Sequence, residues 1–170
     1  MTPSWAKSLP LLSIADRADE YGLAPLFVAA ICYQESRGRI YSARFEPNYR
    51  WLFEPGKYAA KNITSLATET TLQKCSYGLF QIMGATARWM GYEGPLPGLY
   101  ETEENILWGC EYLKYLKGKY HDLPSIASAY NAGSPRRDDN GNFVNAEYVA
   151  GVMGYYGELM QGERNGDISS

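Results

Sequence analysis

The sequence is short of the residues and runs that mark several protein classes. A single histidine, His121, and three cysteines without a C-x-x-C pair lack the spacing of a zinc site. The longest apolar stretch, residues 23–33, contains a proline and is far shorter than the roughly 18 residues of a membrane span. The formal charge of -3 leaves no basic excess for a phosphate backbone. We therefore expect no bound metal, no membrane insertion and no nucleic-acid partner.

Two further signals are missing. At the N-terminus, Lys7 precedes only a short apolar patch, residues 9–14, which charged residues then interrupt, so no secretory signal is evident. We expect any export to use another route. His121 also has no nucleophile, base and orienting group around it, which leaves a triad hydrolase unsupported.

What is present fits one globular domain. The 170 residues are 45% hydrophobic and include 15 tyrosines, and this length is that of a single ordinary domain. Cys32 and Cys110 lie in apolar helical patterns, where a free thiol behaves as a small hydrophobe. We expect these two cysteines to be buried, and a disulfide among the three cysteines stays open.

Helical periodicity, caps and breakers predict about seven helices and no strand of any length. The predicted helices cover residues 9–21, 25 to just before Gly38, 65–74, 79–90, 102–119, 124–132 and 145–161. Residues 38–61 read as an irregular, aromatic-rich insertion and residues 134–142 as a polar surface loop. The fold class is mainly α, with a core over about residues 9–161 and a frayed tail over 162–170.

The second predicted helix carries an unusual carboxylate. Val28, Ile31, Cys32 and Glu35 occupy positions i, i+3, i+4 and i+7, so an apolar face ends in an acid. Apolar neighbours and the negative end of a helix dipole both raise the pKa of a carboxyl group. Glu35 is therefore a candidate proton donor near neutral pH. The alternative is an ordinary helix-end acid that pairs with one of the nearby arginines.

Four motifs occur in an order that resembles the lytic transglycosylases of the soluble-transglycosylase type, within the wider lysozyme-like superfamily. They span residues 23 to about 156. The motifs are Glu35-Ser36 at the end of an apolar helix; Tyr77–Met83 followed by Thr86-Ala87; Asn105-Ile106 with Gly109 and Tyr112-Leu113; and Ala129–Gly133 followed by Tyr148-Val149.

This resemblance implies a single lysozyme-like domain in which Glu35 is the catalytic acid. It also implies that a set of residues binds substrate, namely Gln81, Met83, Tyr130, Asn131 and Tyr148. Other roles stay open for four of them. Met83 and Tyr148 are also suited to packing, and Gln81 and Asn131 to bracing helix ends.

The chain departs from the family pattern in three places. The segment between Glu35 and Gln81 is longer than in compact members, and similar insertions occur in phage-like members. Gly84 stands where a proline commonly follows the Gln-x-Met segment. A serine often present upstream has no clear counterpart. The sugar subsites are therefore the part of the site that the resemblance specifies least.

The resemblance implies chemistry without a metal or organic cofactor. Glu35 would protonate the glycosidic oxygen of peptidoglycan and then accept the proton of the 6-hydroxyl of N-acetylmuramic acid, which closes a 1,6-anhydro ring. Most glycosidases use two carboxylates instead. If Glu46 or Glu54 reached the opposite face of the sugar, a hydrolytic muramidase would result; the alternative is that both are solvated loop acids.

The aromatic residues of the insertion allow two readings. Their rings suit stacking on sugar faces, and they also suit a local core, so we expect a mixture of both roles. The residues concerned are Tyr41, Phe45, Tyr49, Trp51 and Phe53.

Peptidoglycan glycan strands are thus the expected partner of a monomer that acts at the cell wall. A phage-encoded endolysin or another bacteriolytic protein, released before lysis or carried in a particle, would reach the wall without a leader. A non-catalytic wall-binding component of a phage or secretion machine is the rival from another class.

Overall fold

The computed structural model describes residues 2–164 of the chain. These residues fall into two compact units. Unit 1 comprises residues 2–38 and 110–164, and unit 2 comprises residues 39–109. The prediction of one domain over the whole chain stays a prediction.

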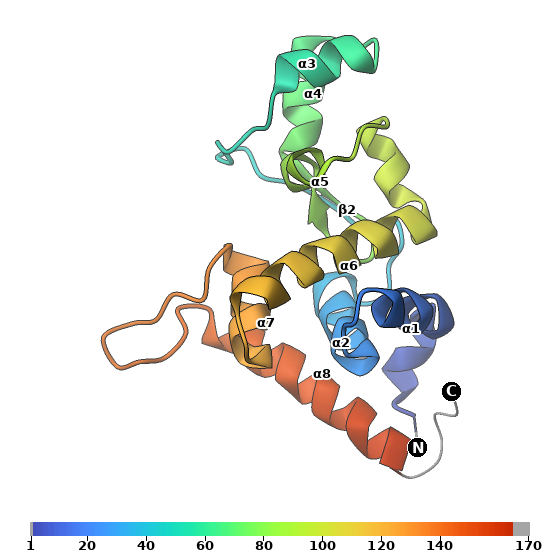
Figure 1. Ribbon diagram of the computed structural model, residues 1–170, viewed down its shortest axis with the longest axis vertical. Coiled ribbons are helices and arrows are strands. Elements are labelled where there is room, and N and C mark those ends of the chain that lie inside the picture. The colour runs from blue at the N-terminus through green and yellow to red at the C-terminus, as the bar shows by residue number, and fades with distance from the viewer. Residues whose placement is uncertain (1, 165–170) are drawn as a thin grey trace. The chain divides into compact units, whose positions relative to one another are not determined.

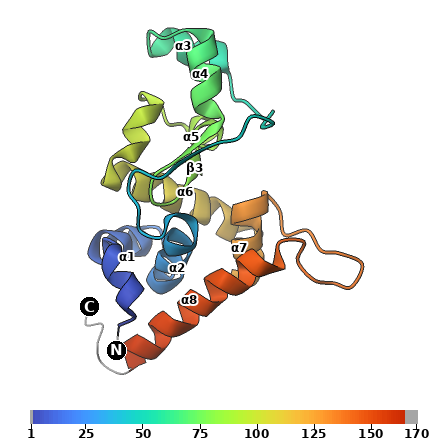
Figure 2. The same ribbon diagram turned by 180° about the vertical axis from the view of Figure 1, so that it is seen from behind.

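Unit 1 is entirely helical in its regular structure. A short 3-10 helix, η1, and four α-helices belong to it, together with the second half of α6, which runs from Thr102 to Lys119. The elements are η1 (Ser4–Ser8), α1 (Leu11–Glu20), α2 (Pro25–Ser36), α7 (Leu123–Ala132) and α8 (Ala146–Arg164). Helix α2 packs against both α1 and α8, and α7 packs against α8, as both views of the ribbon show (Figures 1 and 2). The central helix of unit 1 is therefore α2.

The sequence of α2 explains its central place. Pro25 occupies the first turn, where its missing N–H costs nothing, and residues 27–32 are all buried. A helix that is apolar all round must be enclosed by neighbours. The helix ends at Arg37 in the left-handed conformation, followed by Gly38. A Cβ at Gly38 would overlap Oγ of Ser8, so only glycine lets α2 end against the N-terminal segment.

Unit 2 combines short helices with a small sheet. Its helical elements are α3 (Pro55–Lys61), α4 (Leu66–Gln73), α5 (Gly84–Met90), the 3-10 helix η2 (Leu96–Tyr100) and the first half of α6. Its strands are β1 (Ala43–Phe45), β2 (Cys75–Tyr77) and β3 (Ile82–Met83). They form an antiparallel sheet in the order β1-β2-β3, in which Ser76 pairs with Arg44 on one side and Met83 on the other.

The fold is mainly helical, as predicted, with eight α-helices among the described residues. The expectation of no strand was wrong, because strands of two or three residues are too short to show alternation. The helix predicted over residues 79–90 begins only at Gly84. Residues before it form a turn in which Gly78 and Gln81 both have positive φ, which no helix accepts. Helix α3 was also missed, within the segment predicted to be irregular.

Helix α8 continues three residues beyond its predicted end, to Arg164. Residues 165–170 of the predicted frayed tail lie outside the described residues. Cys32 and Cys110 are buried, as expected, and all three cysteines are free. Across residues 2–164, no helix has both the length and the apolar character needed to cross a membrane. The same residues contain no group of three or more His, Cys, Asp or Glu side chains arranged to hold a metal ion.

Candidate active site in unit 1

Glu35 lies in the last turn of α2 and is partly buried. Its Oε1 accepts a hydrogen bond of 2.5 Å from the phenolic hydroxyl of Tyr148, in the first turn of α8. The packing of α2 against α8 brings these residues together (Figure 2). The expected alternative, in which Glu35 is an ordinary acid paired to an arginine, finds no support from Arg37. That guanidinium instead donates to the hydroxyl of Tyr155 and lies over its ring.

The groups around Glu35 are shielded from water. Burial, and then the negative charge of Glu35, raise the pKa of Tyr148 well above its usual value. The same two causes, in the same order, raise the pKa of Tyr130. Burial also raises the pKa of the Cys32 thiol, with smaller contributions from Cys110 and Glu35. Three of the groups near Glu35 are thus hydroxyl and thiol groups that keep their protons across the physiological range.

Asn131 belongs to a second cluster, at the junction of α7 and α8. Asn131 is exposed at the end of α7, and its Oδ1 accepts a hydrogen bond of 2.9 Å from Nδ2 of Asn145. The same Nδ2 donates to the carbonyl oxygen of Ser128 at 3.1 Å, and the Ser128 hydroxyl donates to Oδ1 of Asn145 at 2.6 Å. Neither Ser128 nor Asn145 was a candidate from the sequence. The sequence feature that could have identified Asn145 is its position as the first residue of a predicted helix.

The other two predicted substrate residues, Gln81 and Met83, belong to unit 2. The Gln81 amide donates to the carbonyl oxygens of Ser42 and Gly78, each at 2.9 Å, and accepts from the Ser76 hydroxyl at 2.8 Å. Its whole amide therefore braces the turn between β2 and β3. Met83 ends β3 and is partly buried, immediately before α5. Their assignment to substrate binding stays a prediction.

The aromatic insertion, also in unit 2, contains both exposed and packed rings, and a role of the exposed rings in sugar stacking stays a prediction. Trp51 is 73% exposed and Tyr41 74%, whereas Phe53 packs against Tyr58 with ring centroids 6.3 Å apart. A hollow of about 320 Å³ opens beside Trp51. It is lined by Tyr49, Trp51, Leu52, Phe53, Ala85, Thr86 and Trp89. This hollow is large enough for a small ligand and is walled mainly by rings.

The two insertion carboxylates have partners of their own. Glu46 forms an ion pair with Arg44, and Glu54 pairs with Lys57 at 2.9 Å. Both side chains are substantially exposed. These pairs match the reading in which both acids are solvated loop groups.

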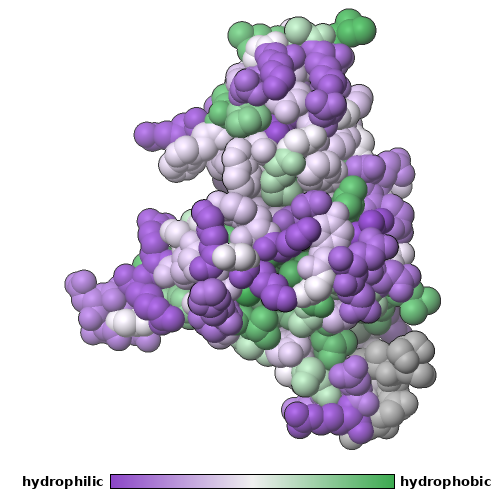
Figure 3. Space-filling view, viewed as in Figure 1, coloured by the Kyte–Doolittle hydropathy of each residue, from purple (hydrophilic) through white to green (hydrophobic). Residues whose placement is uncertain are grey.

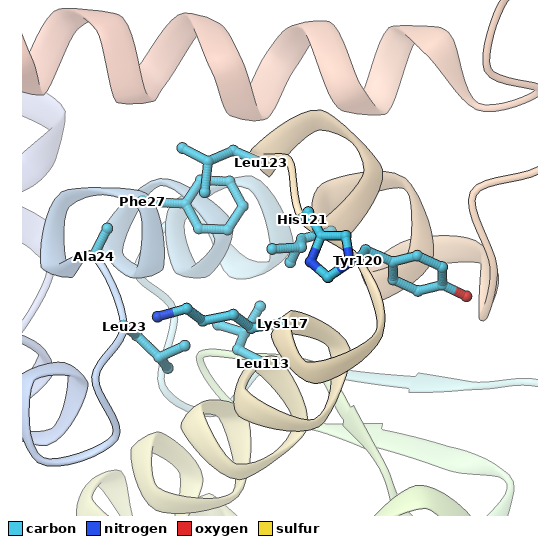
Figure 4. Close-up of a pocket in the computed structure, with 9 residues that line it drawn as sticks. Leu23, Ala24, Phe27, Leu113, Lys117, Tyr120, His121 and Leu123 are labelled. Atoms are coloured by element: carbon cyan, nitrogen blue, oxygen red, sulfur yellow. The ribbon is translucent and has the colours of Figure 1, made fainter.

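A second hollow, of about 340 Å³, lies in unit 1 between the start of α2 and the junction of α6 and α7 (Figure 4). Apolar side chains form its walls, and Lys117 and His121 stand at it. None of the predicted site residues lines this hollow. The Lys117 ammonium donates to the carbonyl oxygen of Gly22, so it has a structural role there. The candidate acid, Glu35, therefore lies outside this hollow.

The mainly helical fold, with a partly buried glutamate at the end of the central helix of unit 1, is consistent with a lysozyme-like domain. More narrowly, the chain belongs to the transglycosylase SLT domain family, whose model matches residues 13–147. Membership indicates peptidoglycan transglycosylase chemistry at the level of the family. The search of curated proteins finds no match. The matched segment includes Glu35 and ends one residue before Tyr148, so the pairing of these two residues rests on geometry alone.

Proposed function

We propose that the protein is a lytic transglycosylase that cleaves the β-1,4 bond between N-acetylmuramic acid and N-acetylglucosamine and leaves a 1,6-anhydro end. The observation that carries this proposal is the Glu35–Tyr148 hydrogen bond on the buried helix α2. One carboxyl group, held by a neutral donor among buried tyrosines, is suited to giving up a proton and taking one back.

The reaction needs only this one carboxyl group. Protonated Glu35 transfers its proton to the glycosidic oxygen, which leaves as the 4-hydroxyl of N-acetylglucosamine. The acetamido oxygen of the muramic sugar stabilises the positive charge that develops at C1. Glu35, now a carboxylate, removes the proton of the 6-hydroxyl of that same sugar while O6 bonds to C1. Glu35 ends the cycle protonated, and no water is consumed.

Tyr148 has a positioning role in this scheme. Its raised pKa keeps the hydroxyl protonated, so it remains a donor to Oε1 whether Glu35 is charged or neutral. A donor at one carboxyl oxygen restricts rotation of the group and stabilises the carboxylate that forms after the first proton transfer. The hydrogen bond thus prepares Glu35 to act as a base in the second step.

The test is a comparison of products and rates on purified sacculi. We expect mass spectrometry to show anhydro muropeptides and Glu35→Gln to slow clearing by about 10²- to 10⁴-fold. Glu163→Gln, on the exposed face of α8, is the matched control and should clear at the normal rate. Equal clearing by Glu35→Gln and the unaltered protein would show that Glu35 is not the acid.

A hydrolytic muramidase is the second candidate, and it requires another carboxylate to activate water. The ion pairs of Glu46 and Glu54 favour the transglycosylase over this alternative. Muropeptides with a reducing end and no anhydro group would support the muramidase, provided that Glu46→Gln or Glu54→Gln abolishes their formation. Tight binding to sacculi without any clearing would support a wall-binding component instead.

We place the action of the protein at the cell wall, where its proposed substrate lies. The proposal includes delivery by a phage or by another machine that releases the protein to the wall. Export of the protein by the general secretion pathway alone would contradict that part of the proposal.

A further inference from the structure

We propose that Asn145 is a positioning residue that fixes the side-chain amide of Asn131 with its N–H groups directed toward substrate. Asn131 then selects an acetamido carbonyl on the sugar and disfavours a free amine. This inference rests on the proposed function, because it names the group that the same site recognises. Three hydrogen bonds around Asn145 support this assignment.

The orientation of the Asn145 amide follows from the chemistry of its partners. The carbonyl oxygen of Ser128 can only accept a hydrogen bond, so the group 3.1 Å from it must be the Nδ2 amine. The other end, Oδ1, accepts the Ser128 hydroxyl at 2.6 Å. Ser128 is fully buried, so a reversed amide would place Oδ1 against a carbonyl oxygen away from water. Asn145 is therefore held in one orientation.

That orientation determines the next amide in the chain of hydrogen bonds. Nδ2 of Asn145 also faces Asn131, at 2.9 Å, and a donor requires an acceptor opposite it. The Asn131 atom in this contact is therefore Oδ1. Its Nδ2 amine points the other way, and Asn131 is exposed at the end of α7. Asn131 thus presents two N–H donors.

The cluster lies next to the catalytic pair within unit 1. Asn145 precedes Tyr148 by three residues, which is close to one helical turn at the start of α8. On α7, Asn131 follows Tyr130, whose pKa is raised in part by the charge of Glu35. Most residues of the loop that joins the two helices, 133–145, are exposed, and the surface there is largely hydrophilic (Figure 3). The proposal places the bound sugar so that it meets both Glu35 and the exposed amide of Asn131.

A pair of N–H donors distinguishes between two states of an amino sugar. The carbonyl oxygen of an acetamido group accepts a hydrogen bond from Nδ2 of Asn131. The ammonium of a deacetylated sugar can only donate hydrogen bonds. It therefore cannot pair with Nδ2 of Asn131, and its positive charge lies against the positive end of that amide. Asn145 contributes to this selection without touching the sugar, because it determines which end of the Asn131 amide is available.

The decisive variant is Asn145→Asp. Its carboxylate still accepts from the Ser128 hydroxyl, and aspartate is well tolerated immediately before a helix, but its second oxygen faces the Ser128 carbonyl that Asn145 now donates to, so we expect a folded protein of lower stability. It no longer donates to Asn131, whose amide turns over to donate to the carboxylate. Asn131 then presents Oδ1 instead of Nδ2. Asn145→Ala removes the restraint without adding a charge. Asn140→Asp, exposed in the same loop, is the matched control for charge.

The measurement is binding of chitotetraose and of the deacetylated glucosamine tetramer, by calorimetry, to proteins that also carry Glu35→Gln. We expect the protein with Asn145 to prefer the acetylated tetramer by about 3- to 10-fold, the range of one hydrogen bond. Asn145→Asp should abolish or reverse this preference, Asn145→Ala should reduce it, and Asn140→Asp should keep it. Asn131→Ala should remove the effect of Asn145→Asp, since the two act as one unit.

Two results would overturn the inference: no preference for the acetylated tetramer when Asn145 is present, or an unchanged preference in both Asn145 variants. Neither result depends on cleavage, because the binding proteins lack the catalytic carboxyl group. Failure of the unaltered protein to cleave sacculi would overturn the proposed function. In that case, a preference for the acetylated tetramer that is lost in the Asn145 variants would still support the role assigned to Asn145. Amide NMR signals of Asn131 that shift in Asn145→Asp, with Asn140→Asp as reference, give an independent reading.

Discussion

The phenolic hydroxyl of Tyr148 donates a hydrogen bond to Oε1 of Glu35 across 113 residues of sequence. The donor lies on α8 and the acceptor at the end of α2, and these helices pack together in unit 1. Because burial and the charge of Glu35 both hold the Tyr148 proton in place, the direction of this hydrogen bond does not change with pH in the neutral range. The proposed transglycosylase mechanism depends on this arrangement.

Removing the hydroxyl should therefore slow the reaction without unfolding the protein. Tyr148→Phe keeps the ring and loses a hydrogen bond to a charged group, a contact that contributes about 1.5–3 kcal/mol. We expect kcat on sacculi fragments to fall by about 10- to 100-fold while KM changes little. Steady-state kinetics measures both constants.

Tyr155→Phe is the control for this variant. Its hydroxyl also receives a hydrogen bond on α8, from Arg37, but it does not contact Glu35. It should keep the normal kcat. If the two variants had the same kcat, the assignment of a positioning role to Tyr148 would be wrong.

Two glycines of α6 should respond to alanine in opposite ways. A Cβ at Gly109 would overlap Cγ of Phe80, which is fully buried in unit 2. We expect Gly109→Ala to lower the free energy of unfolding by about 1–3 kcal/mol, since the ring has no space to move into. At Gly118 nothing lies within 4 Å, so Gly118→Ala should raise the free energy of unfolding by up to about 1 kcal/mol through helix propensity.

Urea unfolding of both alanine variants measures this contrast. The same helix and the same substitution are compared, so the difference reports the space around each glycine. A loss of stability at Gly118 equal to that at Gly109 would contradict the explanation based on Phe80.

The ion pair between Glu69 and Arg88 should be sensitive to the loss of one partner. Both side chains are at most 1% exposed, and Nε and Nη2 of Arg88 donate to the two carboxylate oxygens at 2.8 and 3.1 Å. Arg88→Met leaves a buried carboxylate without its cation, which costs about 3–5 kcal/mol of unfolding free energy. Adding Glu69→Gln should restore part of that loss, because the uncompensated charge is then gone.

Denaturant unfolding of the two single variants and the double variant gives the free energies needed for a double-mutant cycle. Lys57→Met breaks the exposed pair with Glu54 and is the control; it should leave the free energy of unfolding nearly unchanged, because solvent screens an exposed ion pair. A double variant less stable than Arg88→Met would refute the view that charge burial dominates.

Stability should decline in alkaline solution. Burial raises the pKa of Cys110 from 9.0 to about 12 and that of Tyr21 from 10.0 to about 12. A group whose pKa is higher in the folded state contributes stability below its unfolded pKa and loses it as pH rises toward the folded pKa. The free energy of unfolding should thus fall from about pH 9 upward.

Chemical unfolding between about pH 8 and about pH 11 measures the slope of the free energy of unfolding against pH. Cys110→Ala should make this slope shallower, whatever its effect on stability at pH 8, because one titrating group is removed. A free energy of unfolding that does not change over this pH range would show that the folded protein binds no more protons than the unfolded protein.

The residues of α2 show what local patterns predict well. Pro25 at its start, an unbroken apolar run and Gly38 beyond its end placed this helix to within two residues, with Glu35 in its last turn. Caps and breakers act over a few residues and are therefore readable from the chain. The sheet of unit 2 was missed for the same reason, since β3 has two residues and β1 pairs with β2 from a distant segment.

Gln81 shows the limit of motif matching. Its position in the Tyr77–Met83 motif is a property of the chain, but its three hydrogen bonds to Ser42, Ser76 and Gly78 come from the folded turn. A motif identifies a residue, and only its neighbours in space show which of its polar groups are already used. The same holds for Asn131, whose available atoms depend on Asn145.

By itself, then, the order of residues determined a mainly helical chain of the SLT family and placed one carboxylate at the end of an apolar helix. Only the tertiary structure decided that Tyr148 holds that carboxylate and that Asn145 orients Asn131. Propensity and capping operate between neighbours along the chain, whereas hydrogen-bond partners are selected when packing brings distant helices together and removes water from between them.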